Sequence, residues 1–269
     1  MINFIKNIAN LIFKKQLNHL EKYKNIHKGE ICYIIGGGIS LKWFDLQNFS
    51  DKVSIGCNFI PFHNDFDKLN CKYLLLMEPW WFYPYKFLNI KNIKKNYIQS
   101  LYRKAIIKFN KKIYLLNISN LPVTFMNKNL IYTSNDNFKN KLKYTHKIDI
   151  DDPLAGSLNA SISLAIYMGF KECVLVGFDY THSPSRSLHW FEKGKGFFHE
   201  QINYNLVFFK QVRNNIILKT LTLDGESKLL DFVTYENYTK SKPKYKENEF
   251  LLNPNILKTL STWEGYNIY

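Results

Sequence analysis

The hydrophobic positions of this chain fall into short continuous runs, separated by stretches rich in glycine, asparagine and lysine. Such runs are typical of strands buried on both faces of a parallel sheet, which have no solvent-facing side. The clearest runs predict strands within residues 29–38, 52–60, 71–79, 172–180 and 216–223. Three more β-like pieces lie between residues 94 and 150, at 104–109, 112–118 and 129–134, and their order in a sheet cannot be read from the pattern.

Helical spacing alternates with these runs. Residues 157–168 predict a helix whose small side chains (Ala160, Ser161 and Ala165) allow close packing on a sheet, and Gly169 is placed to end it. Residues 203–215 predict a second helix, and residues 40–49 a helical turn with Ser40 as a cap. The order of strand, glycine loop, helix and strand predicts an α/β fold with a parallel sheet and helices on both faces.

Length and composition predict one large domain, or one domain with appended segments. The chain has 269 residues, of which 46% are hydrophobic, enough for a sizeable core. Its four cysteines show no CxxC spacing, and three of them lie inside hydrophobic runs as small buried hydrophobes. This usage predicts a reducing, cytoplasmic compartment without disulfides or a zinc site.

The charge of the chain is strongly basic, with a formal net value of +15. Only Arg103, Arg186 and Arg213 are arginines, so the excess is almost entirely lysine. Lysine and asparagine enrichment is what an AT-rich genome produces, and arginine is the residue preferred for phosphate forks and base edges. The composition therefore argues against nucleic-acid binding, and it suits an anionic membrane surface better.

Residues 1–28 predict an amphipathic helix followed by lysines. The segment lacks the small-residue cleavage site of a signal peptide, and no stretch of the chain is long enough for a transmembrane helix. Two interpretations stay open. The helix either lies in the plane of the inner leaflet as an anchor, or packs on its own domain or on a partner subunit of a homo-oligomer.

Polar residues follow the predicted strands at residues 36–40, 57–58, 78–79 and 179–182. In open α/β sheets, ligands bind beyond these carboxyl ends, near the point where strand order reverses. The triplet Gly36, Gly37 and Gly38 would let backbone N–H groups approach a phosphate. A tight strand-to-helix turn without a ligand explains the triplet equally well, since neither GxGxxG nor GK[ST] is present.

Five blocks in order carry a family resemblance: "IIGGGISLKWFDL", "VSIGCNFI", "GSLNASISLAIYMGFKECVLVGFDY", "HEQINYNLVFFKQV" and "LTLDGESKLLDF". They resemble the small bacterial sialyltransferases that cap lipooligosaccharide from CMP-activated sugars. They resemble more loosely the motility accessory factor glycosyltransferases and the pterin diphosphokinase-like proteins. The resemblance covers residues 30–60 and 150–232. It implies a Rossmann-like domain at residues 29–235 with a smaller lid around 181–198, a C-terminal extension at 236–269, and catalysis without a metal.

The resemblance also implies site residues. Those matching the nucleotide-binding positions of the family are Gly36, Gly37, Gly38, Ser40, Asn58, Gly156 and Ser157. Glu78 stands where the family has an asparagine before a proline. The aromatic run at 78–87 includes Trp80 and Trp81, which would stack on a donor or acceptor sugar, although core packing explains the run as well.

The catalytic expectation centres on His199, which precedes a predicted helix as the histidine of the family does. Histidine suits the removal of a proton from an acceptor hydroxyl. His182 and His189 are rivals on the lysine-rich loop, which a plain solvated connection also explains. Negative charge develops on the departing CMP phosphate, and in the family tyrosine side chains stabilise it. Here Tyr180 lies one position from the matching place, and Arg186, His189, Lys193 or Lys195 would serve as substitutes.

These observations predict a glycosyltransferase that moves a sugar, a nonulosonic (sialic) acid, from a CMP-sugar donor to a glycan or glycolipid acceptor of the cell surface, lipooligosaccharide or capsule. The expected reaction is an inverting displacement that needs no metal cofactor. Two alternatives stay open: a pterin-type diphosphokinase that uses ATP and Mg²⁺, and a non-catalytic nucleotide-binding protein.

Overall fold

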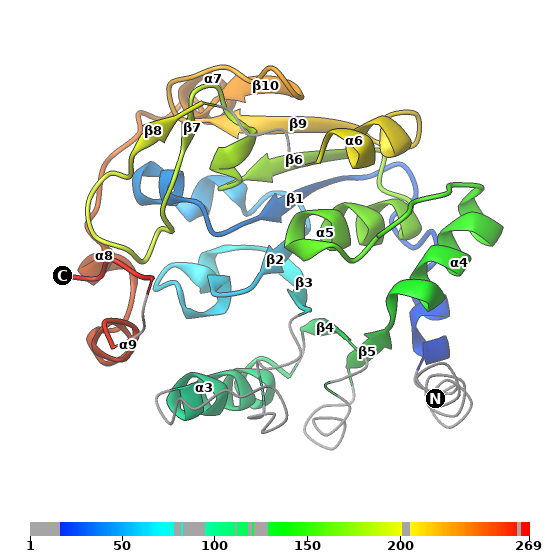
Figure 1. Ribbon diagram of the computed structural model, residues 1–269, viewed down its shortest axis with the longest axis horizontal. Helices are drawn as coiled ribbons and strands as arrows, with labels where there is room; N and C mark the ends of the chain where they lie inside the picture. Colours follow the sequence, from blue (N-terminus) through cyan, green and yellow to red (C-terminus); the bar gives the residue numbers. More distant parts are fainter. Residues whose placement is uncertain are drawn as a thin grey trace.

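The computed structural model describes residues 17–77, 82, 95–110, 112–117, 120, 129–200, 205–262 and 265–269. Its centre is an eight-stranded sheet of order β10-β9-β6-β1-β2-β3-β4-β5, in which every neighbouring pair is parallel. Figure 1 shows the sheet running from β10 at the top to β5 at the bottom. Its strands are β1 (Ile31–Ile35), β2 (Ser54–Cys57), β3 (Cys71–Leu76), β4 (Ile113–Asn117), β5 (Leu130–Thr133), β6 (Glu172–Val176), β9 (Ile217–Thr222) and β10 (Asp231–Thr234).

Short helices and one small ribbon surround the sheet. The α-helices are α3 (Lys95–Lys108), α4 (Asn135–His146), α5 (Gly156–Tyr167), α6 (Leu206–Val212), α7 (Tyr235–Thr239), α8 (Asn248–Leu251) and α9 (Pro254–Leu260). The 3₁₀ turns are η1 (His19–Tyr23), η2 (Ile39–Trp43), η3 (Leu46–Phe49), η4 (Ile60–Phe62), η5 (Phe66–Lys68) and η8 (Asp179–Thr181). A two-stranded antiparallel ribbon pairs β7 (Ser185–Arg186) with β8 (Phe198–His199).

Each face of the sheet has its own hydrophobic core. On β1, Tyr33 and Ile35 face one core, while Cys32 and Ile34 face the other. The first core takes side chains from α3, α7, α8 and α9, and the second takes them from η1, α4, α5 and α6. Figure 1 accordingly places α4 and α5 on one side of the sheet and α8 and α9 on the other. The expectation of a parallel sheet with helices on both faces is confirmed.

The order of the strands reverses between β1 and β6. From β1 the chain builds β2 to β5 in one direction, and it then returns through α5 to place β6 and β9 on the other side of β1. After β1 the chain turns toward the first core with η2, and the helix that follows β6, α6, packs in the second core. Loops that leave adjacent strands toward opposite faces create a crevice at the carboxyl ends of those strands.

Most predicted elements are confirmed, and one is wrong. The runs at 29–38, 52–60, 71–79, 112–118, 129–134, 172–180 and 216–223 contain the expected strands, and α5 and α6 confirm the two helices. Residues 104–108 of the run at 104–109 belong instead to α3, where Ile106 is buried and the adjacent Ile107 is 58% exposed. Gly169 ends α5 with a φ of +87°. Most of the predicted N-terminal helix lies outside the described residues.

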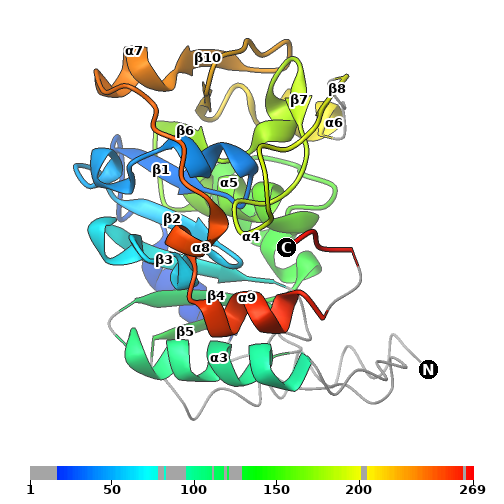
Figure 2. The ribbon, with the colours of Figure 1, turned by 90° about the vertical axis from the view of Figure 1, so that its left-hand side faces the viewer.

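The C-terminal residues belong to the same core as the sheet. Tyr235, Leu251, Leu257 and Ile268 are all buried in the first core. Helix α9 lies beside α3, as Figure 2 shows from the side. The segment predicted as a C-terminal extension therefore completes one face of the sheet.

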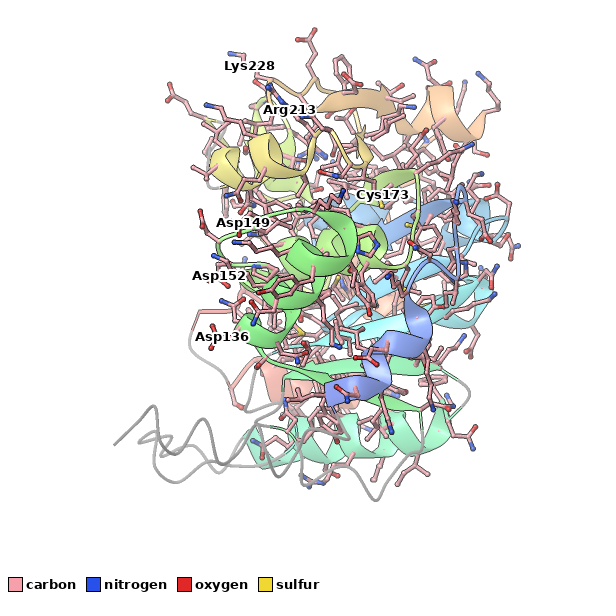
Figure 3. The ribbon with its side chains drawn as sticks, turned by 90° about the vertical axis from the view of Figure 1, so that its right-hand side faces the viewer. Asp136, Asp149, Asp152, Cys173, Arg213 and Lys228 are labelled. Carbon is pink, nitrogen blue, oxygen red and sulfur yellow. The ribbon has the colours of Figure 1, made fainter. Side chains whose placement is uncertain are left out.

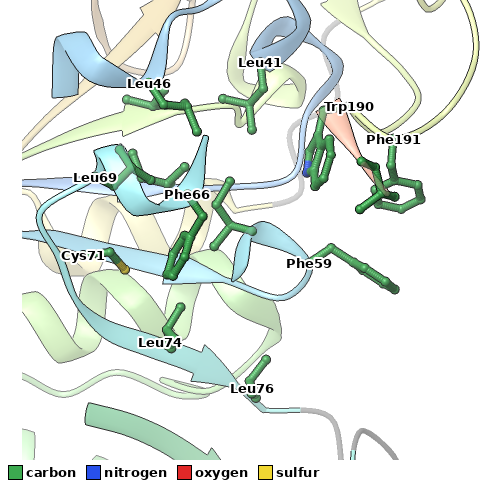
Figure 4. Close-up of a cluster of buried hydrophobic side chains, with 14 of the residues drawn as sticks. Leu41, Leu46, Phe59, Phe66, Leu69, Cys71, Leu74, Leu76, Trp190 and Phe191 are labelled. Atoms are coloured by element: carbon green, nitrogen blue, oxygen red, sulfur yellow. The ribbon is translucent and has the colours of Figure 1, made fainter. Parts of the chain in front are cut away.

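The loop between β7 and β8 is anchored in the core. Trp190 and Phe191 are 0% and 1% exposed, and the ring of Phe191 lies 4.9 Å from that of Phe59. Figure 4 shows Trp190 beside the buried cluster around Leu41 and Phe66, with Phe191 next to it on the side of Phe59. This is the segment predicted as a lid, and its two aromatic anchors hold it over the carboxyl end of β1.

All four cysteines are buried, free thiols, which confirms their interpretation as small hydrophobes. Cys32 and Cys173 are paired in register on β1 and β6, with their sulfurs 3.2 Å apart. Cys173 is labelled in the interior in Figure 3. Within the described part of the chain, no helix is long and apolar enough to cross a membrane.

Candidate functional site

A cavity of about 370 Å³ lies at the carboxyl ends of β1, β2 and β6, the position that the reversal of strand order predicts. It gathers eight of the predicted site residues: Gly37, Gly38, Asn58, Ser157, Tyr180, Arg186, His189 and His199. These residues come from segments far apart in the sequence. The structure brings together three of the four predicted strand ends, at 36–40, 57–58 and 179–182, and the fourth, at 78–79, lies outside the described residues.

The three glycines of the loop after β1 have different neighbours. A Cβ on Gly36 would lie 2.5 Å from the carbonyl oxygen of Gly177, and one on Gly38 would lie 2.7 Å from the Asp179 carboxylate. The amide of Gly38 donates to Gly177 O at 2.7 Å. A Cβ on Gly37, in contrast, would meet only the His189 ring, at 3.5 Å. The outer glycines are required by the close approach of the β6 loop, whereas Gly37 faces the cavity.

The loop after β1 is held to the loop after β6 by Ser40 and Asp179. The Asp179 carboxylate, 2% exposed, accepts hydrogen bonds from Ser40 N at 2.7 Å and from Ser40 Oγ at 2.5 Å. Ser40 was expected to cap the following turn, and this is wrong: Gly38 occupies that position, without a side-chain cap. The hydroxyl is used to join two strand ends.

Of the nucleotide-binding residues predicted above, Gly36, Ser40 and Gly156 lie outside the cavity lining, and Ser157 lines it. Ser157 belongs to the first turn of α5, whose N-cap residue, Ala155, makes no side-chain cap hydrogen bond. The first N–H groups of a helix lack intrahelical partners and carry partial positive charge. The start of α5 therefore supplies the cavity with donors suited to an anion.

Asn58 and Phe59 contribute the wall that follows β2. Asn58 adopts a left-handed φ of +51°, which asparagine tolerates better than most residues. Its backbone N–H donates to Leu75 O at 3.2 Å, which fixes the turn against β3. The turn places Phe59 in both the cavity wall and the first core.

His189 is paired with a buried carboxylate. Its Nδ1 lies 2.9 Å from Glu192 Oε1, which also accepts the backbone amide of His189 at 2.8 Å. Glu192 is 2% exposed, yet hydrogen bonds from His189 and from the amide of Asn267 outweigh the effect of burial and lower its pKa. Because an ionised carboxylate only accepts, Nδ1 carries a proton.

Arg186 is fixed between two aromatic rings. Its guanidinium lies 5.0 Å from the Trp43 ring and 4.3 Å from the Phe198 ring, and Nη2 contacts Asp224 at 3.3 Å. Its side chain is only 9% exposed. The charge of Arg186 is thus already compensated by the Asp224 carboxylate, which lies outside the lining of this cavity.

His199 lies on β8, opposite Ser185 of β7. Its Nδ1 donates to Glu200 O at 2.9 Å, because a carbonyl oxygen only accepts. This leaves Nε2 unprotonated when the ring is neutral. His199 also borders a second cavity of about 750 Å³, which is lined by Ser183, Pro184, Phe198, His199, Glu200, Leu206, Lys228 and Leu229.

The remaining predicted site residues have surroundings of their own. Burial lowers the pKa of His182, which lies outside the 370 Å³ cavity lining, with Nδ1 3.9 Å from Asp179. Burial raises the pKa of Tyr180, so that it remains a neutral phenol. The ammonium of Lys195 lies over the Tyr245 ring at 5.3 Å. Glu78, Trp80 and Trp81 lie outside the described residues.

Several residues of the site were not predicted from the sequence. Among them, Phe59, Phe191 and Tyr266 line the cavity, and Glu192 accepts a hydrogen bond from Nδ1 of His189. The three-residue spacing of His189 and Glu192 is a local signal that was available. Tyr266 comes from the other end of the chain and carries no such signal. Among the described residues, no group of three or more His, Cys, Asp or Glu side chains could hold a metal ion.

No family model and no curated protein sequence matches the chain. Among solved structures, it is similar to the sialyltransferase CST-II in complex with a trisaccharide acceptor and CMP, at 16% identity and a TM-score of 0.46 over 84% of this chain and 95% of that one. It is similar to CstII from Campylobacter jejuni with the substrate analogue CMP-3FNeuAc, at 15% identity and a TM-score of 0.43 over 86% and 99%. It is also similar to the MAf glycosyltransferase from Magnetospirillum magneticum AMB-1, at 12% identity and a TM-score of 0.46, over 91% of this chain and 40% of that one.

Proposed function

We propose that this chain is a glycosyltransferase that moves a sugar from a CMP-sugar, of the nonulosonic (sialic) acid type, to a hydroxyl of a surface glycan or glycolipid. One observation carries the proposal: His199 borders two cavities, one at the strand ends and one outside the β7–β8 ribbon. A direct transfer needs a donor, an acceptor and a base between them. The two cavities and the histidine between them provide these three places.

The donor belongs in the cavity at the strand ends. Gly37 and the start of α5 present backbone N–H groups, which suit the phosphate of the nucleotide. Asn58 and Ser157, which the motif resemblance assigns to nucleotide binding, line the same cavity. The choice of CMP rests on that resemblance, and the choice of cavity rests on the geometry.

The acceptor belongs in the larger cavity, of about 750 Å³, where Phe198, Leu206 and Pro184 offer apolar surface to the faces of sugar rings. In the reaction, neutral His199 takes the proton of the acceptor hydroxyl at Nε2. The acceptor oxygen forms the bond to the anomeric carbon, and the bond from that carbon to the phosphate oxygen breaks with its electron pair leaving on CMP. The glycoside, CMP and a protonated His199 are the products.

The test is a transfer assay with CMP-sialic acid and the kind of acceptor that the CST-II structure contains, a trisaccharide. His199→Ala should abolish transfer while the Kd for CMP stays within about twofold, because the base does not hold the nucleotide. His146→Gln, a histidine on α4 away from both cavities, is the control. Full transfer activity in His199→Ala would refute the assigned role.

Metal independence belongs to the same proposal and is tested by EDTA. Transfer should survive the chelator. A requirement for Mg²⁺, together with ATP rather than CMP binding, would instead identify a diphosphokinase. Nucleotide binding without transfer or donor hydrolysis would identify a binding protein.

A further inference from the structure

Three cationic or ionisable nitrogen side chains line the cavity at the strand ends: Arg186, His189 and His199. They differ in the hydrogen-bond or ion-pair partner that each already has. Asp224 compensates Arg186, and a neutral carbonyl holds Nδ1 of His199. Of the three side chains, only that of His189 is hydrogen-bonded to a buried carboxylate, that of Glu192. The three groups are therefore suited to different tasks.

The Glu192 carboxylate accepts from Nδ1 of the His189 ring at 2.9 Å and can serve as the counter-ion of an imidazolium. An ionised carboxylate that accepts from Nδ1 stabilises an imidazolium more than a neutral imidazole. Glu192 is fixed in turn, since Oε2 accepts the amide of Asn267 at 2.9 Å. With both oxygens engaged and 2% of the residue exposed, the carboxylate has little freedom to leave the ring.

The ring itself is packed on two sides. Phe191 stacks on it with centroids 5.0 Å apart and planes 16° apart, and Tyr266 meets it edge-on at 5.8 Å. Its side chain is still 51% exposed. The ring carbon next to Nε2, Cδ2, is the atom that a Cβ on Gly37 would meet. The edge of the ring that bears Nε2 therefore adjoins the glycine loop.

We propose that His189 is a catalytic residue that, as an imidazolium held by Glu192, donates a hydrogen bond from Nε2 to the phosphate of the nucleotide. The proposal rests on the function proposed above. When the bond between sugar and phosphate breaks, the phosphate gains one negative charge, and the charged donor stabilises that gain. The proton stays on His189, and the proton of the acceptor goes to His199. Glu192 is a positioning residue, since it acts through the ring.

The experiment compares CMP with cytidine, which lacks the phosphate. In the wild-type protein CMP should bind more tightly. In His189→Gln that preference should shrink about tenfold, the size expected for one charge-assisted hydrogen bond, while the Kd for cytidine stays within about twofold. Glu192→Gln should shrink the preference as well, and Glu192→Asp should restore part of it. His146→Gln should leave the preference unchanged.

The outcomes separate the two proposals. An unchanged CMP preference and an unchanged kcat in His189→Gln would overturn the role of His189 and leave the transferase proposal standing. If the wild-type chain binds another nucleotide, such as UMP, the donor class is wrong and the same comparison is made with that nucleotide and its nucleoside. If no nucleotide binds, both proposals are wrong. A loss of cytidine binding in His189→Gln would show a structural role instead and also overturn the proposal.

Discussion

The carboxylate of Asp179 accepts both the amide and the hydroxyl of Ser40, which joins the loop after β6 to the loop after β1. Asp179→Ala should lower the free energy of unfolding by about 2–3 kcal/mol, because it leaves buried donors without an acceptor. Ser40→Ala removes only the hydroxyl and should cost about 1 kcal/mol. Chemical denaturation of both variants measures the difference, and equal losses would contradict the double role of the carboxylate.

The glycine triplet offers a graded test. Gly36→Ala and Gly38→Ala each drive a methyl group against the β6 loop, at 2.5 Å and 2.7 Å from its nearest atoms, and should destabilise the fold by about 1–3 kcal/mol. Gly37→Ala should fold normally, since its methyl group meets only His189, at 3.5 Å. The same methyl group should weaken CMP binding. Thermal unfolding with and without CMP separates the two effects, and three equal melting temperatures would refute the distinction.

The backbone of Asn267 supports the site from the far end of the chain. Its amide donates to Glu192 Oε2 at 2.9 Å, while its side chain is exposed. Asn267→Pro removes the donor and should lower the free energy of unfolding by about 1–2 kcal/mol and weaken CMP binding. Asn267→Ala keeps the amide and should behave as wild type. Titration calorimetry on this matched pair checks the expectation, which fails if the two variants bind CMP equally.

His63 should make the protein sensitive to acid. It is 3% exposed, and burial lowers its pKa to about 4, from a value near 6.5 in the unfolded chain. Between these values the unfolded chain binds the extra proton, so stability falls as the pH drops through this window. The loss should reach about 2 kcal/mol between pH 7 and pH 5.

The matching variant is His63→Gln, which cannot take up the proton. Urea unfolding at pH 7 and at pH 5 should show a smaller loss in this variant than in the wild type. Parallel losses in the two proteins would show that other groups cause the acid sensitivity.

The sequence predicted the sheet better than its surroundings, for a physical reason. A continuous run such as residues 173–176 has no polar side, and only a strand between two layers buries all of it. The run at 104–109 is ambiguous, because three adjacent apolar residues fit a strand or a helix. In α3, Ile106 is buried and Ile107 is solvent-exposed, which a single sequence does not specify.

The site was predictable as far as it depends on strand ends. Gly37, Asn58 and Tyr180 follow parallel strands, and the carboxyl ends of such strands meet at one edge. The contribution of Tyr266 depends on the path of the last residues across the first core. That path is set by tertiary packing, and no local pattern encodes it.

The arrangement of the cysteines provides a reporter of global opening. Cys32 and Cys173 lie side by side on the neighbouring strands β1 and β6, and Cys57 and Cys71 lie on β2 and β3, all at most 1% exposed. A thiol reagent reacts with the thiolate, and burial raises the pKa of Cys57 to about 12 and that of Cys71 to about 11. Labelling therefore has to wait until the sheet separates. The rate of thiol modification, followed by mass spectrometry, measures how often the native sheet opens, without any introduced probe.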